Sequence, residues 1–545
     1  MIASQNFKLQ DGCTVEMLGE IPQALVLLEQ SLELGRLLVF TKLGYCTAAL
    51  AFLKQIQKYG DCHLFFANLE DTVCNFSAIL IMPNKIVLAR DLMGSIPLFY
   101  AQTKQGFVIS ISLEKLRHHL NINAISREYL EIFLAANYAS SPQWEITPWQ
   151  GIFRVQPNHI CTLQYKKVHT EQFAVVPTIQ VYPNIDLIGA QLENELVKAL
   201  PDTEKSGILL SGGFDSSLLL SLANRKSKEL YALHHIARIG DKNEDTYFAE
   251  LAVQFVSGHI RMDTLPISNY WDYKNWKNYA ATYEEPNVGI AGGELETYRA
   301  LQLKSVGIGN LISGIGGDAF REDLAFLGDF YRNRNYFSLL YQLWRLSEFI
   351  QIDRSDWELE QNYDQNNLKK ATYLQLSQKV QEITQIGWLN QKKPKARSSV
   401  YKQLLYGHAA FSLEQSVLWK YGISQYYPFL TRKSLALALA IPPEKHIDKN
   451  LGTRAFFKRC FAHCYHPEML RRNSKDSWGV YHSVGLAQEF HGLQQLFEKS
   501  QLALYGLLNP QAFIDILYNR LQHGETLNFI EARVVALEIW LQTRT

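Results

Sequence analysis

Residues 208–219 read ILLSGGFDSSLL, and the longer half of the chain can be interpreted outward from this stretch. Its three leading apolar residues, with Gly207 before them, predict a short buried strand. A tight turn, Ser211–Gly213, follows, and Ser216 begins a helix that continues to Ala223. A strand, a glycine turn and a helix in this order are typical of a parallel α/β sheet.

The turn has the features of a phosphate site. Glycine lets backbone N–H groups approach an anion closely, and the start of a helix adds unpaired N–H groups and the positive end of the helix dipole. Asp215 would repel a bare phosphate, but it fits a site in which Mg²⁺ bridges the carboxylate and the phosphates. No GK[ST] follows, and the stretch is not GxGxxG, so neither a kinase-type P-loop nor a dinucleotide fingerprint is present.

Alternating strands and helices continue on both sides of this turn. Helices are predicted over Ile185–Leu200 and Thr246–Val256. The predicted strands are Gly207–Leu210, Glu229–Ala237, His259–Leu265 and Gly309–Ser313. Beyond about residue 330 the pattern is helical, with many aromatic residues, Leu and Gln.

Residues 1–175 are instead rich in short strands at close spacing, which suggests an antiparallel arrangement. A helix is predicted over Ser126–Asn137, with Ser126 as its N-cap. The predicted strands are Leu37–Thr41, Cys62–Asn68, Ser77–Met82, Lys85–Ala89, Leu98–Ala101, Gly106–Ser110 and His159–Gln164. Val175–Asn184 contains two prolines and little periodicity, and we place the domain boundary there.

Composition excludes several classes of protein. The chain has 545 residues, 54 Lys+Arg against 53 Asp+Glu, and 47% hydrophobic residues, which is too apolar for a disordered protein and too neutral for a nucleic-acid binder held by phosphate contacts. Seven scattered cysteines do not form a disulfide framework. Cys460 and Cys464 with His463 and His466 have metal-like spacing, but no second ligand pair accompanies them. No signal peptide or membrane span is visible, so we expect a soluble, cytoplasmic protein.

SGGFDSS resembles the SGGxDS pyrophosphate loop of the ATP pyrophosphatases, and within that group the chain resembles the asparagine synthetase family. That family cleaves ATP between the α and β phosphates and forms an acyl-adenylate, from which an amine or ammonia displaces AMP. Further stretches resemble family elements in the same order: LYALHHIAR (230–238), NEDTYFA (243–249), EEP (284–286), SGIGGDAF (313–320), YPFLTR (427–432) and RRNSKDSW (471–478). Two more resemble its glutaminase domain: LARDLMGSIPLFY (88–100) and GIFRVQPNHICTL (151–163).

The resemblance implies a fold and a site. The fold would combine a degenerate α+β glutaminase-like domain of Ntn-type αββα architecture (1–178) with an α/β parallel-sheet ATP pyrophosphatase domain whose C-terminal part is helical (185–545). ATP would contact Leu210, Ser211, Gly212, Gly213, Asp215, Ser216, Ser217, Ile236 (at the adenine), Ser313 and Gly314. Asp215 and Asp318 would hold Mg²⁺, and Lys475 would stabilise charge on the phosphates and later the oxyanion.

Two positions depart from the family pattern. A glutaminase of this type uses an N-terminal Cys as nucleophile, whereas this sequence begins Met1-Ile2, so we expect the first domain to be a retained scaffold. Ile315 stands where asparagine synthetases have Glu and β-lactam synthetases have Tyr, and it cannot activate an amine. The candidate general bases are Glu284, Glu285 and Glu294, and a solvated surface acid is the alternative for each.

These departures favour a ligase that closes an amide within one substrate, as lasso-peptide cyclases do. Such an enzyme adenylates an Asp or Glu side chain of a precursor peptide, and the free α-amine then forms a macrolactam. The implied partners are ATP, a precursor peptide and a peptidase that removes its leader, with no nucleic acid and no membrane. Aromatic residues of the C-terminal region would suit a wall around a peptide, although core packing is the interpretation that we favour: Trp344, Tyr363, Tyr373, Trp388, Tyr401, Trp419, Tyr426 and Tyr427.

Three alternatives stay open. One is an asparagine synthetase that uses free ammonia. Another is a β-lactam synthetase-like enzyme, against which the missing Tyr weighs. The third is a non-catalytic scaffold on a synthetase fold, against which the intact SGGFDSS, Asp318 and Lys475 argue.

Overall fold

The computed structural model describes most of the chain. The described residues are 5–10, 14–18, 21–32, 35–55, 66, 68–69, 75–135, 145–164, 167–172, 184–236, 243–256, 258, 260–321, 324–346, 371–377, 410–472 and 479–544.

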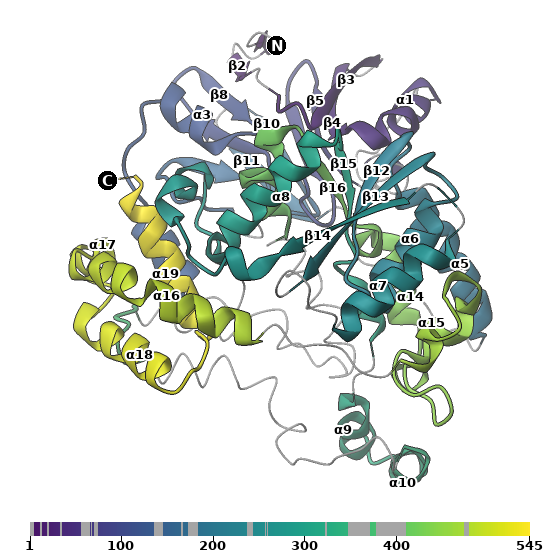
Figure 1. Ribbon diagram of the computed structural model, residues 1–545. Coiled ribbons are helices and arrows are strands. Elements are labelled where there is room, and N and C mark those ends of the chain that lie inside the picture. The colour runs from purple at the N-terminus through teal and green to yellow at the C-terminus, as the bar shows by residue number, and fades with distance from the viewer. Residues whose placement is uncertain are drawn as a thin grey trace.

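Two β-sheets formed by residues 5–172 pack face to face (Figure 1). The first sheet has the order β1 (Gln5–Lys8), β2 (Thr14–Met17), β8 (Gly106–Ser110), β7 (Phe99–Gln102) and β9 (Ile152–Arg154). It is mixed, because β2 and β8 run parallel while the other neighbours are antiparallel. The second sheet is antiparallel and has the order β11 (Lys167–Gln172), β10 (His159–Gln164), β6 (Ile86–Arg90), β5 (Phe76–Ile81), β4 (Gly35–Lys42) and β3 (Leu25–Leu32).

Helices cover the outer faces of this pair of sheets. Alternate residues of β4 show why: Leu38 and Phe40 pack between the two sheets, whereas Leu37 and Val39 face outward into a second apolar cluster. Helix α1 (Cys46–Gln55) contacts β3 and β4 on that outer side. The outer face of the first sheet packs against α3 (Leu113–His119) and α4 (Arg127–Ala135). The result is four layers in the order helix, sheet, sheet, helix.

A third, fully parallel sheet forms the centre of the longer half. Its order is β14 (Ile260–Pro266), β13 (Glu229–Ile236), β12 (Lys205–Leu209), β15 (Asn310–Ile312) and β16 (Ser424–Tyr426). One face packs against α5 (Ile185–Ala199), α6 (Phe214–Ala223), α7 (Glu244–Phe255), α14 (Arg432–Ala440) and α15 (Ala455–Cys460). The opposite face packs against α8 (Gly293–Ser305). Such two-sided burial is typical of parallel sheets.

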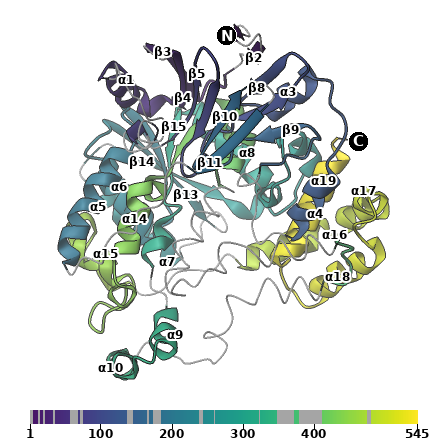
Figure 2. The ribbon, with the colours of Figure 1, turned by 180° about the vertical axis from the view of Figure 1, so that it is seen from behind.

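The C-terminal helices join the two halves. Figure 2 shows α16 (Gly479–Glu498), α17 (Gln501–Leu504), α18 (Pro510–Gln522) and α19 (Phe529–Gln542) gathered on one side. Helix α19 packs on α4, and the rings of Trp149 and Trp540 lie 5.7 Å apart. Helices α9 (Ala325–Arg332) and α10 (Tyr336–Arg345) lie at the periphery (Figure 1). Within the described residues, no helix has both the length and the apolar character needed to cross a bilayer.

A buried ion pair also connects the halves. Lys42 Nζ lies 2.9 Å from Glu414 Oε2, and neither side chain is exposed. The rings of Phe411, Tyr426 and Tyr427 surround the ammonium group at 5.0–5.6 Å. Burial lowers the pKa of Lys42 and raises that of Glu414, while the attraction between them opposes both shifts.

Most predicted elements are present with boundaries shifted by one or two residues. The predicted strand Cys62–Asn68 is wrong where it can be checked, because Phe66 and Asn68 are helical. Strands β1, β2, β3, β9, β11 and β16 were not predicted. β9 and β16 have three residues each, which carry too little pattern to be recognised. The predicted linker lies outside the described residues except for Asn184, whose side chain caps α5.

The aromatic residues of the C-terminal region mostly pack in the core. Tyr373, Trp419, Tyr426 and Tyr427 are buried, whereas Trp344 on α10 is 72% exposed. Tyr363, Trp388 and Tyr401 lie outside the described residues.

Candidate active site

The carboxyl ends of the parallel strands bring two glycine loops together. Strands β12 and β15 are direct neighbours, with Ile208 paired to Ile312, so the loops that follow them start side by side. A Cβ atom on Gly314 would lie 3.3 Å from the backbone nitrogen of Ser216. The two loops are therefore in van der Waals contact, in the position where open α/β sheets bind ligands.

The first loop is a tight turn that requires glycine. Gly212 has a φ of +77°, and a Cβ atom there would lie 2.1 Å from the backbone oxygen of Asp245. The backbone N–H of Ser211 donates to Ser216 Oγ at 3.1 Å, and that of Gly213 donates to Ser211 Oγ at 3.3 Å. These bonds hold the turn against the first residues of α6.

The start of α6 provides donors for an anion. Gly213 is the N-cap, and it has no side chain to accept from the first N–H groups of the helix. The hydroxyl of Ser217 is buried, and it has no hydrogen-bond partner among the described residues. An orphaned buried hydroxyl beside uncapped N–H groups fits a site for an anionic ligand such as phosphate.

Asp215 and Asp318 meet at one arginine. Arg454 Nη1 and Nη2 lie 2.9 and 3.0 Å from the two carboxylate oxygens of Asp215, and Nη2 also lies 2.8 Å from Asp318 Oδ1. Asp215 Oδ2 and Asp318 Oδ1 contact the same nitrogen atom, Arg454 Nη2, so the two carboxylates lie close to each other. The structure thus brings both predicted metal ligands to one point beside the glycine turn.

This pair of carboxylates fits a hard divalent cation. Mg²⁺ is bound through oxygen, and it is commonly held by one or two carboxylates together with the phosphates of a nucleotide. Asp215 lies two residues after Gly213, next to the anion-binding turn, and the side chain of Asp318 is 52% exposed. Both observations suit a cation held between the protein and a ligand.

The predicted adenine side lies at the end of β13. Ile236 and Leu210 are both buried. His234 connects the region, because its Nδ1 lies 2.7 Å from the backbone oxygen of Leu210 and its Nε2 lies 3.0 Å from Thr246 Oγ1. Burial lowers the pKa of His234, so this ring is neutral near pH 7.

Besides Arg454, two supporting residues were not singled out from the sequence, and both contact segments that are distant in the chain. Arg472 is buried, donates to the backbone oxygen of Gly212 at 2.7 Å, and pairs with Asp245. Tyr465 donates its hydroxyl to the backbone oxygen of Phe214 at 3.1 Å. Arg472 falls within the basic stretch 471–478, which is the one signal that could have found it.

The second glycine loop, which follows β15, begins with the hydrogen-bonded Ser313 and has the apolar side chain of Ile315 at its tip. Ser313 is buried: its N–H donates to the backbone oxygen of Tyr426 at 2.9 Å, and its hydroxyl accepts from the N–H of Ile315 at 3.3 Å. The side chain of Ile315 is exposed at 39%.

Glu284 and Glu285 face the first half of the chain. Glu284 accepts from the hydroxyl of Ser112 at 2.5 Å and from the N–H of Leu113 at 2.6 Å, and so caps α3. Burial raises its pKa, and these hydrogen bonds oppose the shift. Glu285 pairs with the buried Arg154.

Both carboxylates line a cavity of about 420 Å³ between the halves, together with Pro22, Pro97, Phe99, Ile111, Ser112, Lys115, Thr282, Ser412, Gln415, Ser416, Trp419 and Lys420. None of the contacts described for Glu284 or Glu285 reaches the glycine turns. Glu294, the third candidate base, accepts a hydrogen bond from Asn275 at 3.0 Å. Lys475 lies outside the described residues.

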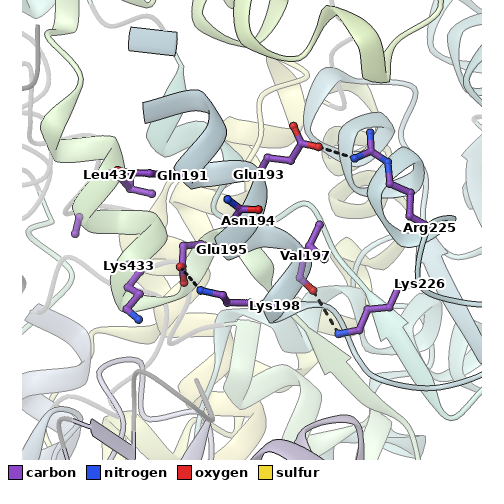
Figure 3. Close-up of a pocket in the computed structure, with 11 residues that line it drawn as sticks. Gln191, Glu193, Asn194, Glu195, Val197, Lys198, Arg225, Lys226, Lys433 and Leu437 are labelled. Atoms are coloured by element: carbon purple, nitrogen blue, oxygen red, sulfur yellow. Dashed lines mark hydrogen bonds and ion pairs between the residues drawn. The ribbon is translucent and has the colours of Figure 1, made fainter. Parts of the chain in front are cut away.

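A second cavity lies at the other end of α6. The cavity has a volume of about 880 Å³. It is lined by α5, α14 and the residues that follow α6 (Figure 3). Several of its charged groups are paired: Arg225 with Glu193, Lys198 with Glu195, and Lys226 with backbone oxygens at the end of α5. Glu193, His463 and Cys464 bring potential metal-ligand atoms within 4.8 Å of one another, but the Arg225 cation contacts both Glu193 and Cys464. None of the described residues that line this cavity belongs to the glycine turns, so the cavity is separate from them.

Comparison with known families gives matches to both halves. The asparagine synthase model matches residues 188–542, and a glutamine amidotransferase domain model matches residues 76–174. The chain belongs to the asparagine synthase family. The first match covers the parallel sheet and both glycine loops, and the second falls within the two-sheet half.

Sequence relatives of this asparagine synthase family chain are distant and partial. One relative is a protein of Methanocaldococcus jannaschii that carries the name glutamine-hydrolysing asparagine synthetase 1. It is 25% identical over 264 residues, which are 46% of this chain and 44% of the relative. Human glutamine-hydrolysing asparagine synthetase is 26% identical over 212 residues, 35% of each chain. The chain thus aligns with less than half the length of either.

Solved structures add no further argument. Glutamine phosphoribosylpyrophosphate amidotransferase from B. subtilis, solved with ADP and GMP, is 10% identical and matches 44% of this chain and 47% of its own with a TM-score of 0.17. A score this low does not establish a common fold.

Proposed function

We propose that this chain is an ATP-dependent amide-forming ligase whose nucleotide site is formed by the two glycine loops. The observation that carries the proposal is the convergence at one point of the uncapped start of α6, the orphaned Ser217 hydroxyl, Asp215 and Asp318. Anion donors next to two carboxylates that share one arginine suit a metal-bound polyphosphate better than either feature alone would.

The proposed reaction has two steps. In the first, a substrate carboxylate attacks the α phosphorus of ATP, an acyl-adenylate forms, and pyrophosphate leaves. In the second, an amine attacks the acyl carbon, loses one proton and displaces AMP, which leaves an amide.

The residues of the chain have separate roles in these steps. The backbone of Ser211–Gly213 and the hydroxyls of Ser216 and Ser217 bind the leaving pyrophosphate. Asp215 and Asp318 would hold Mg²⁺, which neutralises charge on the α–β bridge when it is bound. Ile236 contacts the adenine, and Leu210, Ser313 and Gly314 border the nucleotide. Lys475 is proposed to stabilise the charge that develops on the phosphates.

For the substrate, we propose an intramolecular amide closure, in its most specific form a lasso-type macrolactam. The support is Ile315: the tip of the second loop is apolar and exposed, and it offers no group that could accept a proton from a free amine. A substrate that carries its own amine depends less on such a group, because the amine is delivered by its covalent connection. A precursor peptide and a leader-removing peptidase are the partners that this form implies.

An asparagine synthetase that uses free ammonia is the second candidate. The names of the two partial relatives favour asparagine as the product, but they give glutamine hydrolysis and not free ammonia as the source of the amine. The cavity at Glu284 and Glu285 lies between the halves, where it could hold a small polar molecule. A general base at either residue would have to give up its present contact with α3 or Arg154.

ATP–pyrophosphate exchange tests the common part of these proposals. The purified chain is incubated with Mg·ATP, labelled pyrophosphate and, separately, aspartate or a peptide with an Asp or Glu side chain near a free α-amine. Exchange with the peptide, AMP release and a product lighter by one water would support macrolactam closure. Asparagine formed from aspartate and ammonium would replace it with the second candidate. An Asp215→Ala chain that keeps full biological activity would indicate a non-catalytic scaffold.

A further inference from the structure

Arg454 is the residue that connects the two predicted metal ligands. Its guanidinium makes a two-pronged contact with Asp215 and a third contact with Asp318, and it also donates to the backbone oxygen of Gly317 at 3.1 Å. Arg454 does not belong to either glycine motif, and it lies 239 positions after Asp215 in the chain.

The surroundings hold this guanidinium in place. The side chain of Arg454 is 13% exposed, and its charged group lies 5.8 Å from the centre of the Phe457 ring. Its backbone is left-handed, with a φ of +56°, at the residue directly before α15. A non-glycine residue rarely adopts this conformation, and strain of this kind is concentrated at functional sites.

Arg454 contacts the same carboxylate oxygens that a divalent cation would need as ligands. A fork-like arginine contact occupies both oxygens of the Asp215 carboxylate. Mg²⁺ requires carboxylate oxygens at about 2.1 Å in near-octahedral geometry, so it would compete with the guanidinium for them. A guanidinium that leaves two carboxylates needs another anion, because a charge of this low exposure is costly to leave unpaired.

The nearest alternative anion would be the nucleotide itself. Asp215 lies in the first turn of α6, directly beside the glycine turn where the phosphates are proposed to bind. Arginine binds phosphate with the same fork geometry that it uses for a carboxylate. A small movement of the side chain would therefore exchange one pair of anions for another.

We propose that Arg454 is a nucleotide-binding residue that exchanges partners: it releases Asp215 and Asp318 to the metal and binds the phosphates that become pyrophosphate. This inference rests on the proposed function, since it requires a metal-bound polyphosphate at the glycine turn. It makes binding of metal and of nucleotide interdependent through one side chain.

The test measures metal and nucleotide separately on the full chain. Mn²⁺ alone serves as the metal probe and is followed by electron paramagnetic resonance, and α,β-methylene-ATP with saturating Mg²⁺ serves as the nucleotide probe and is followed by calorimetry. Arg454→Met removes the guanidinium but keeps an unbranched side chain. We expect it to bind Mn²⁺ roughly tenfold more tightly, because a competing cation is gone, and the nucleotide roughly tenfold more weakly, because a charged phosphate contact is lost.

Opposite changes distinguish partner exchange from a structural role. If Arg454 only positioned the two carboxylates, both affinities would fall, and that result would overturn the inference, as would an unchanged affinity for either probe. Arg459→Met is the matched control: Arg459 lies on α15, which Arg454 directly precedes, and it pairs with Asp186 at the surface, so both affinities should stay as in the wild type.

The inference can still be tested if Arg454→Met does not fold or if the wild-type chain does not bind the nucleotide. If Arg454→Met fails to fold, as judged by its circular dichroism, Arg454→Lys replaces it; lysine keeps the charge but not the fork, and both affinities should shift in the same directions by less. If the wild-type chain binds no nucleotide, the proposed function fails, while the Mn²⁺ comparison still decides whether Arg454 competes for the carboxylates.

Discussion

Gly212→Ala is the substitution that most sharply tests the geometry of the glycine turn. Gly212 has a φ of +77°, which costs a residue with a Cβ atom about 1–2 kcal/mol. The added Cβ would also lie 2.1 Å from the backbone oxygen of Asp245, and real Cβ contacts are essentially never below 3.0 Å. Because the clash is with backbone, the turn must move by most of this difference.

Such a movement would displace the N–H groups that are proposed to bind phosphate. Loss of even one charge-assisted hydrogen bond weakens affinity by about tenfold or more. We therefore expect Gly212→Ala to lower the melting temperature and to weaken binding of Mg·α,β-methylene-ATP at least tenfold, as measured by calorimetry.

Gly307→Ala provides the control for backbone strain alone. Gly307 has a φ of +74°, yet a Cβ atom there would meet nothing within 4 Å. It should show a small loss of stability and unchanged nucleotide affinity. The reasoning would be refuted if Gly212→Ala bound the nucleotide like the wild type, or if Gly307→Ala weakened binding equally.

Two further predictions concern buried and half-buried charges. Lys42→Met leaves the Glu414 carboxylate buried without its cationic partner, so we expect a loss of about 3–5 kcal/mol and, for a chain of 545 residues, a melting temperature about 3–4 °C lower. Part of this loss should be recovered in Lys42→Met/Glu414→Leu, and an unchanged melting temperature for the single variant would contradict the prediction. The contact of His482 with Asp272 raises the pKa of the imidazole, so it stabilises the fold below the unfolded-state pKa and this contribution is lost as pH rises through the folded-state pKa. The melting temperature of His482→Gln should therefore lie below that of the wild type at about pH 5.5 and approach it at about pH 9. Because the ring is half exposed, the loss in free energy of unfolding should be at most about 1 kcal/mol. A melting-temperature deficit that grows with pH would exclude this explanation.

The parts of the fold that follow from local sequence could be predicted. The apolar run 208–210, followed by Ser211 and two glycines, indicated the strand before α6. The side chains of Asn184 and Asn243 cap the starts of α5 and α7. The glycine turn itself was predictable because all of its essential geometry lies within seven consecutive residues, 211–217. Short strands such as β16 were not, because three residues carry no usable period.

Contacts between distant segments could not be predicted in the same way. Nothing in the sequence around Arg454 indicates that its side chain joins Asp215 and Asp318. Similarly, Glu284 was proposed as a base because EEP (284–286) resembles a family element, but its observed contact is with the start of α3, 171 positions earlier. In both cases the partner is set by how the layers pack, and that depends on the whole chain.

The most direct test of the account is to locate the nucleotide by calorimetry with Mg·α,β-methylene-ATP on three chains. The wild type should bind one nucleotide, and Asp215→Asn should bind it at least about tenfold more weakly, because a carboxylate ligand of the metal and its charge are removed. Lys226→Met, in the separate cavity at the far end of α6, should bind like the wild type. A nucleotide that binds Asp215→Asn as tightly as the wild type, or whose affinity depends on Lys226 instead, would contradict the assignment of the glycine turns as the active site.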